Sequence, residues 1–171
     1  SHHCWSEDPG PTCVLMAYID DATSRVAARF YAYEDTVPAL DSFGRYVRSY
    51  GIPHGAYADK HTTYRATGEP TVAEQLAGTK PQSQFERALA ELGVELIHAH
   101  SPQAKGRVER LFKTLQDRLV KGLRLAGIAT IEAANQFLKT WLPRYNQCFA
   151  VQPAEGAHLH PPPPGRRELG P

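Results

Sequence analysis

The stretch SPQAKGRVERLFKTLQDRL, residues 101–119, decides the fold prediction for this chain. Ser101 is a candidate N-cap residue, and Pro102 suits the first helical position because its fixed φ is already helical. Apolar residues then recur at the three- and four-residue spacing of a helix with one buried face, namely Val108, Leu111, Phe112, Leu115 and Leu119. We therefore expect a long amphipathic helix that reaches about residue 125, with Gly127 as its stop signal.

The opposite side of this predicted helix is strongly basic. Its cations between residues 105 and 124 are Lys105, Arg107, Arg110, Lys113, Arg118, Lys121 and Arg124, against the acids Glu109 and Asp117. Such an excess favours a polyanionic partner. The formal net charge of the whole chain is only +1, so the sequence predicts a local basic patch rather than a polycation.

Composition places the chain among ordinary globular proteins. It has 171 residues, of which 42% are hydrophobic, enough for a core without disulfide bridges. No apolar run approaches the roughly 20 residues that cross a bilayer, and the N-terminal residues lack the features of a signal peptide. The three scattered cysteines favour reduced thiols. We expect a cytoplasmic protein without a membrane partner.

The segments around the long helix predict the α/β class. Residues 12–19 and 25–32 are apolar runs of strand length, and they predict a hairpin with Asp20 and Asp21 in an Asx-type turn at its tip. The remaining expected elements are a helix over 36–50, a strand over 54–58, a helix over 82–92, a strand over 94–98 and a last helix from Thr130 that Pro143 bends or ends. This order predicts a mixed sheet flanked by helices.

Two segments show no sustained periodicity. Residues 65–81 predict a long loop, and residues 151–171, with the run HPPPPGRRELGP, predict a proline-rich linker or tail. We therefore expect a core over residues 1–150.

Two carboxylates have informative positions. Asp59 follows the strand over 54–58, at the end where ligand-binding side chains of open α/β sheets gather, and Glu109 lies on the basic helix. Together they could hold Mg²⁺, which takes one or two protein carboxylates and completes its shell with water and phosphate oxygens. Simpler interpretations stay open, because Asp59 could be a turn residue and Glu109 a surface charge paired with Lys105 or Lys113.

Several strings resemble the DDE transposase and retroviral integrase catalytic cores, including those of insertion-sequence transposases. YIDDATSRVAARF resembles the second and third strands of that RNase H-like fold, and YADKHTTYR resembles the strand end that bears the second catalytic aspartate. HSPQAKGRVERLFKTLQDRLV resembles the catalytic-glutamate helix, and RYNQCFAVQPAE resembles the stretch that closes the core. The resemblance covers almost everything from residue 1 to about residue 155.

The resemblance implies a function and a site. Asp59 and Glu109 would be catalytic and would hold two Mg²⁺ or Mn²⁺ ions, which promote hydrolysis at a transposon end and then strand transfer to target DNA. It implies that Lys105 and Lys113 face the DNA, with Arg107 and Arg110 as further phosphate contacts. Transposition by this family also implies a homo-oligomer in the synaptic complex, acting at the bacterial nucleoid.

The chain departs from the family pattern at its start. SHHCW resembles the residues that follow the first catalytic aspartate, which would therefore fall two positions before Ser1 and leave the first strand truncated. An alternative function is therefore an inactive transposase remnant that only binds DNA. A ribonuclease H type hydrolase would need further acidic residues in the sheet, and none is evident.

A zinc site is the competing metal hypothesis. Its candidate ligands are His2, His3, Cys4, Cys13, His98 and His100. Their spacing matches no common zinc module, and the alternation of His98 and His100 is also typical of one face of a strand end.

Overall fold

The computed structural model describes residues 2–3, 13–58, 82–98 and 102–153. The described elements fall into two compact units. The hairpin unit contains strands β1 (His2–His3), β2 (Cys13–Ile19) and β3 (Val26–Tyr31) with helices α4 (Pro102–Leu125) and α5 (Ile131–Phe149). The α1 unit contains helix α1 (Thr36–Tyr50), strand β4 (Gly55–Ala58), helix α3 (Gln84–Glu91) and strand β5 (Glu95–His98). The predicted α/β class is confirmed.

The described strands form two small sheets. β1, β2 and β3 make an antiparallel sheet in that order, and β4 pairs with β5 in parallel. The sequence predicted one mixed sheet, whereas the described strands pair in two separate sheets. Within the described residues the first strand is only two residues long and pairs with the start of β2.

The predicted hairpin of β2 and β3 is confirmed, with Leu15 opposite Phe30 and Ile19 opposite Val26. The Asp20 carboxylate accepts from the Ala22 amide at 3.3 Å and from the Thr23 hydroxyl, so Asp20 forms the expected side-chain-stabilised turn. Ser24 has a φ of 57°, a left-handed conformation that closes the turn.

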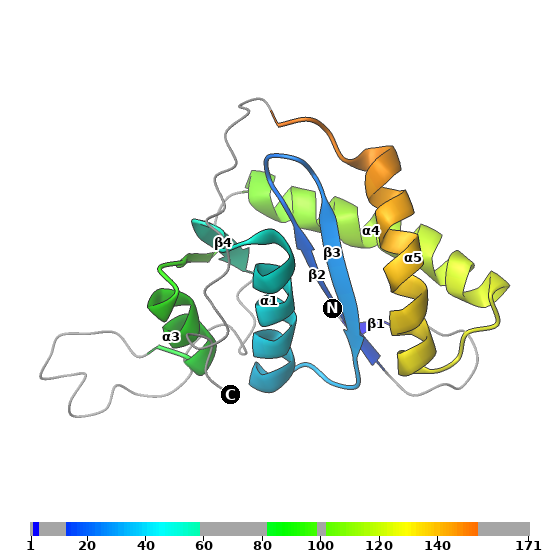
Figure 1. Ribbon diagram of the computed structural model, residues 1–171, viewed down its shortest axis with the longest axis horizontal. Coiled ribbons are helices and arrows are strands. Elements are labelled where there is room, and N and C mark those ends of the chain that lie inside the picture. The colour runs from blue at the N-terminus through cyan, green and yellow to red at the C-terminus, as the bar shows by residue number, and fades with distance from the viewer. Residues whose placement is uncertain (1, 4–12, 59–81, 99–101, 154–171) are drawn as a thin grey trace, which may run out of the picture. The chain divides into compact units, whose positions relative to one another are not determined.

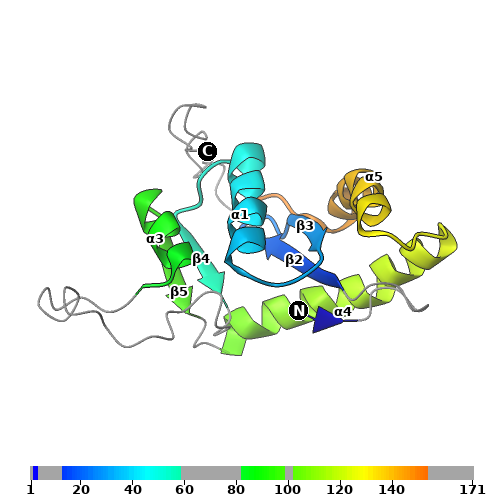
Figure 2. The same ribbon diagram turned by 90° about the horizontal axis from the view of Figure 1, so that it is seen from below.

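The core of the hairpin unit lies between the sheet, α4 and α5 (Figures 1 and 2). Four leucines at four-residue intervals form the buried face of α4, and they are Leu111, Leu115, Leu119 and Leu123. They pack in one cluster with Leu15, Val26, Phe30, Ala134 and Leu138. The apolar spacing of the sequence therefore describes this face correctly from Leu111 onward. Val108 was expected on it too, but its side chain is 37% exposed.

The sequence predicted that Pro143 bends or ends helix α5, and the structure shows that Pro143 does not end it. The helix begins after the N-cap Thr130, as predicted, but it continues through Pro143 to Phe149. Proline in a helix interior removes one hydrogen bond and costs about 3 kcal/mol. Contacts on both sides of Pro143 outweigh this cost, because Leu138 is buried before it and the Asn146 side chain bonds to Val26 after it.

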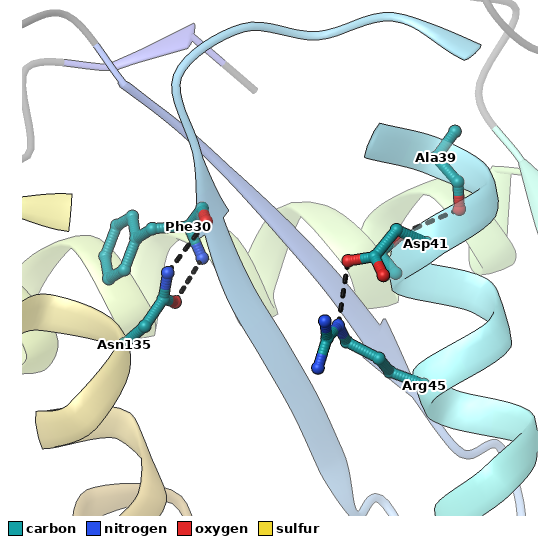
Figure 3. Close-up of polar contacts among 6 residues, drawn as sticks. Phe30, Ala39, Asp41, Arg45 and Asn135 are labelled. Carbon is teal, nitrogen blue, oxygen red and sulfur yellow. Dashed lines mark hydrogen bonds and ion pairs between the residues drawn. The ribbon is translucent and has the colours of Figure 1, made fainter. Parts of the chain in front are cut away.

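Strand β3 ends the sheet order, and α5 covers its outer edge. Asn135 Oδ1 accepts from the Phe30 amide at 2.9 Å, and Asn135 Nδ2 donates to the Phe30 carbonyl at 3.0 Å (Figure 3). Asn146 makes the same pair of bonds with Val26. The two amide side chains satisfy backbone groups that an uncovered edge strand would leave unpaired.

The α1 unit confirms its predicted elements. Helix α1 starts at the N-cap Asp35 and ends at Gly51, whose φ of 92° suits glycine. Phe43 of α1 packs edge-on against Phe85 of α3, with ring centroids 5.9 Å apart. The exposed pair Asp41 and Arg45 is joined at 2.8 Å along α1 (Figure 3). β4 ends at Ala58, so Asp59 follows the strand directly, as expected.

Candidate nucleic-acid interface on the long helix

Glu109 lies on the second turn of α4, ahead of the part of the helix that is anchored in the core. Its side chain is exposed, and so are those of Arg110 and Lys113. Leu111 is 5% exposed and is the first buried residue of α4 among its described side chains. The helix therefore presents one carboxylate and two cations to solvent beside the end of the core.

The basic side of α4 is partly neutralised further along the helix. Lys121 Nζ lies 2.5 Å from Asp117 Oδ1, and this hydrogen bond lowers the pKa of the Asp117 carboxyl below its usual value. The Arg118 guanidinium lies 4.8 Å from the ring centroid of Phe149 in α5, a cation–π contact. Arg110 and Lys113, which are exposed beside Glu109, are therefore the better candidates for binding an anion on this helix.

Arg107 contacts the β2–β3 hairpin, and its role as a phosphate contact stays a prediction. Its Nη1 atom lies 2.5 Å from Asp21 Oδ1 and donates to the Asp21 carbonyl oxygen at 2.8 Å. This guanidinium is engaged with the tip of the β2–β3 hairpin. Lys105 belongs to the first turn of α4, and its side chain lies outside the described residues, as does the predicted N-cap Ser101.

Asp59 also lies outside the described residues, although the strand before it has the predicted position. Its pairing with Glu109 therefore stays a prediction. Within the described residues, no three His, Cys, Asp or Glu side chains gather as a metal-binding group. Of the proposed zinc ligands, Cys4 and His100 lie outside the described residues, and the side chains of His2, His3 and His98 are not described either.

Sequence reasoning did not find the contact between Arg107 and Asp21. Helix geometry did indicate that Arg107 lies on a different face from Glu109. Each residue turns the helix by about 100°, so residues two apart point in nearly opposite directions. Arg107 and Glu109 therefore could not share one face, whereas Glu109 and Lys113, four apart, do. The hairpin tip as a partner was not evident from the sequence, since 86 residues separate Asp21 from Arg107.

Comparison with known proteins identifies relatives. The chain is 42% identical over 163 residues to y4bF of Sinorhizobium fredii, a protein whose name assigns it as a transposase. It is 33% identical over 173 residues to the transposase for insertion sequence IS1202 of Streptococcus pneumoniae. The chain is a relative of insertion-sequence transposases. The predicted resemblance is thereby confirmed, and no protein-family model matches the sequence.

These matches cover 95% and 99% of the transposase-like chain but only 35% and 36% of the relatives. The chain thus spans about a third of the length of the curated relatives it matches. A chain of the cryo-EM structure of the simian T-cell lymphotropic virus intasome, in complex with the PP2A regulatory subunit B56 gamma, has a similar fold. The TM-score is 0.66 at 18% identity, over 96% of the transposase-like chain and 53% of the other.

One further prediction concerned membranes. Among the described helices, none is long and apolar enough to cross a bilayer.

Proposed function

We propose that this chain forms an RNase H-like catalytic core of a DNA transposase. The observation that carries the proposal is the exposed Glu109 on a basic helix, in a chain whose relatives at 42% and 33% identity are transposases. The parent reaction would be hydrolysis of a phosphodiester at a transposon end, followed by strand transfer to target DNA. It would take place at the bacterial nucleoid in the cytoplasm, within a synaptic homo-oligomer.

The donor chemistry of Glu109 fits a divalent cation. Its carboxylate is a hard oxygen ligand, it is exposed, and its own helix supplies cations that would hold phosphate beside it. Asp59 would be the second ligand, and the family pattern includes a third carboxylate, the first catalytic aspartate. Two Mg²⁺ or Mn²⁺ ions bound there would stabilise the attacking and leaving oxygens of an in-line displacement.

The basic residues would hold the DNA backbone. Lys105, Arg110 and Lys113 lie within four residues of Glu109 along the helix, close enough to position phosphates next to it. Lysine and arginine contacts to phosphate supply affinity and orientation without reading sequence. We leave Arg107 out of this set because its Nη1 atom is bound to Asp21.

The test is a nicking assay with Mg²⁺ on the full-length gene product that contains this chain, using DNA that carries the transposon end. Glu109→Gln should abolish nicking and leave DNA binding intact, because it removes a metal ligand without removing a cation. Glu132→Gln is the matched control, since Glu132 is an exposed glutamate on α5. Equal nicking by the Glu109→Gln and unaltered proteins would overturn the proposal, and DNA binding without any nicking would identify an inactive remnant.

A further inference from the structure

Among the described side chains of α4, the fully buried ones begin at Leu111. Buried side chains hold the helix from Leu111 to Leu123, whereas Val108, Glu109 and Arg110 are all exposed. Helix ends without packed side chains open locally at low free-energy cost. A tertiary contact at this turn of α4 therefore helps to keep Glu109 in one place.

Arg107 supplies such a contact. Its Nη1 atom is held by both the carboxylate and the backbone carbonyl oxygen of Asp21. Arg107 and Glu109 are two residues apart and therefore point to nearly opposite sides of α4. A contact that pins Arg107 to the hairpin fixes the rotation of this turn and directs Glu109 away from the hairpin.

The hairpin tip is a firm point of attachment. The Asp20 carboxylate binds the Ala22 amide and the Thr23 hydroxyl, and the Thr23 carbonyl oxygen accepts from the Val151 amide at 2.8 Å. Asn146 binds both backbone groups of Val26, where β3 begins. Asp21 thus belongs to a turn that is tied to the end of α5, while its own side chain is 81% exposed.

We infer that Asp21 and Arg107 are positioning residues that hold the Glu109 turn of α4 against the β2–β3 hairpin. The catalytic part of this inference rests on the proposed function, whereas the anchoring does not. Arg107 acts through its contact with Asp21, not by binding phosphate. The pair is exposed, so salt weakens it, and it stabilises a local geometry more than the whole fold.

The first experiment measures amide hydrogen exchange at Gly106 to Arg110 in the full-length protein without DNA. Asp21→Ala should speed exchange there up to about fivefold, the scale of one exposed ion pair, and leave the amides of Leu115 to Leu123 unchanged. Arg107→Ala should have the larger effect because it also removes the bond to the Asp21 carbonyl oxygen. The Asp21→Arg protein should show the fastest exchange at these amides, because two like charges then face each other. Adding Arg107→Asp restores a pair of opposite charges and should reverse that increase.

Asp117→Ala is the matched control, because it breaks an exposed ion pair of the same 2.5 Å length within the anchored part of the same helix. It should leave exchange at Gly106 to Arg110 and the cleavage rate unchanged. Equal exchange in the Asp21→Ala, Asp117→Ala and unaltered proteins would overturn the anchoring.

The second experiment separates positioning from phosphate binding. Asp21→Ala should lower the rate of metal-dependent cleavage about fivefold while DNA affinity matches that of Asp117→Ala, which loses the same charge. If Arg107 were a phosphate contact, Asp21→Ala would release it and DNA would bind more tightly than to Asp117→Ala, and that result would overturn the inference. If the Asp21 and Arg107 variants alter exchange at Gly106 to Arg110 while the Glu109→Gln protein cleaves DNA fully, the anchoring is supported and the proposed function is overturned.

Discussion

The Asn146 side chain forms two hydrogen bonds with the backbone of Val26. Its Oδ1 accepts from the Val26 amide and its Nδ2 donates to the Val26 carbonyl oxygen, each at 2.8 Å. Asn135 repeats the arrangement at Phe30, eleven residues earlier on α5. A helix thereby takes the place of a neighbouring strand at two points along the edge of β3, and this arrangement fixes the register of α5 against the sheet.

Replacing Asn146 should destabilise the hairpin unit. Asn146→Leu leaves an amide and a carbonyl of partly buried backbone without partners, at an expected cost of about 1–3 kcal/mol. Urea unfolding followed by circular dichroism measures the change. Gln147→Leu is the control, because Gln147 is the exposed neighbour on the same helix. Equal unfolding midpoints for the two variants would contradict the role of the two bonds.

Gly122 permits the close approach of α4 and α5. A Cβ atom at this position would lie 3.2 Å from Phe137 Cζ and 3.5 Å from Trp141 Nε1. Gly122→Val should therefore force the helices apart and lower the free energy of unfolding by about 1–3 kcal/mol. Gly106→Ala, where the nearest atom is Arg110 Nη1 at 3.7 Å, should instead stabilise by about 0.5–1 kcal/mol through helix propensity. Thermal unfolding of both variants measures the two predicted changes in stability. A Gly122→Val protein as stable as the unaltered one would disprove the steric argument.

Tyr145 should ionise at unusually high pH. Burial raises the pKa of its hydroxyl above the usual value of about 10, and the nearby charge of Arg118 partly opposes this shift. Because the folded-state pKa is raised, the resulting stabilisation is complete below the unfolded pKa and is lost as pH rises through the folded one. An alkaline titration of tyrosinate absorbance should lose one step above the usual tyrosine pKa in Tyr145→Phe. Arg118→Met should move that step to still higher pH, and movement to lower pH would contradict the assigned cause.

DNA binding should depend on Lys105 and Lys113 through counterion release. Replacing either lysine by alanine in the full-length protein should reduce the slope of log affinity against log salt by about 1. Lys139→Ala is the control, since Lys139 is an exposed lysine of α5 outside the proposed interface. Affinities at several salt concentrations supply the slopes. A lysine whose removal leaves the slope unchanged does not belong to the interface.

Local signals predicted most of the described elements. Helix α1 has the predicted bounds, Thr36 to Tyr50. Its acidic N-cap, its helical apolar pattern and the glycine after its last residue all indicate the same start and end. Pro143 shows the limit of such signals, since the expectation that it bends or ends the helix left open whether α5 continues, and α5 runs through Pro143 to Phe149. The Trp141 ring stacks on Tyr145, and Tyr145 meets the tilted ring of Phe149, so ring contacts continue along α5 past the proline. These contacts add to those that offset its lost hydrogen bond.

The candidate site was predictable in part. Glu109 could be singled out because a lone carboxylate within a basic helix, in a specific string, carries information about chemistry. The assignment of Arg107 to DNA could not anticipate Asp21, since a contact across 86 residues depends on where the hairpin and the helix meet. Asn135 and Asn146 gave no signal either, because an asparagine inside a helix pattern does not reveal which backbone groups it will meet.

The sequence alone determined the helices and strands, the buried leucine face of α4 and the basic side around Glu109. These depend on periodicity, caps and charge, which act over a few residues. Only the tertiary structure decided that α5 passes Pro143, that two asparagines cover the edge of β3 and that Asp21 holds Arg107. Those outcomes depend on the partners that folding brings together, because burial and hydrogen bonding to distant backbone outweigh local preferences of a few kcal/mol.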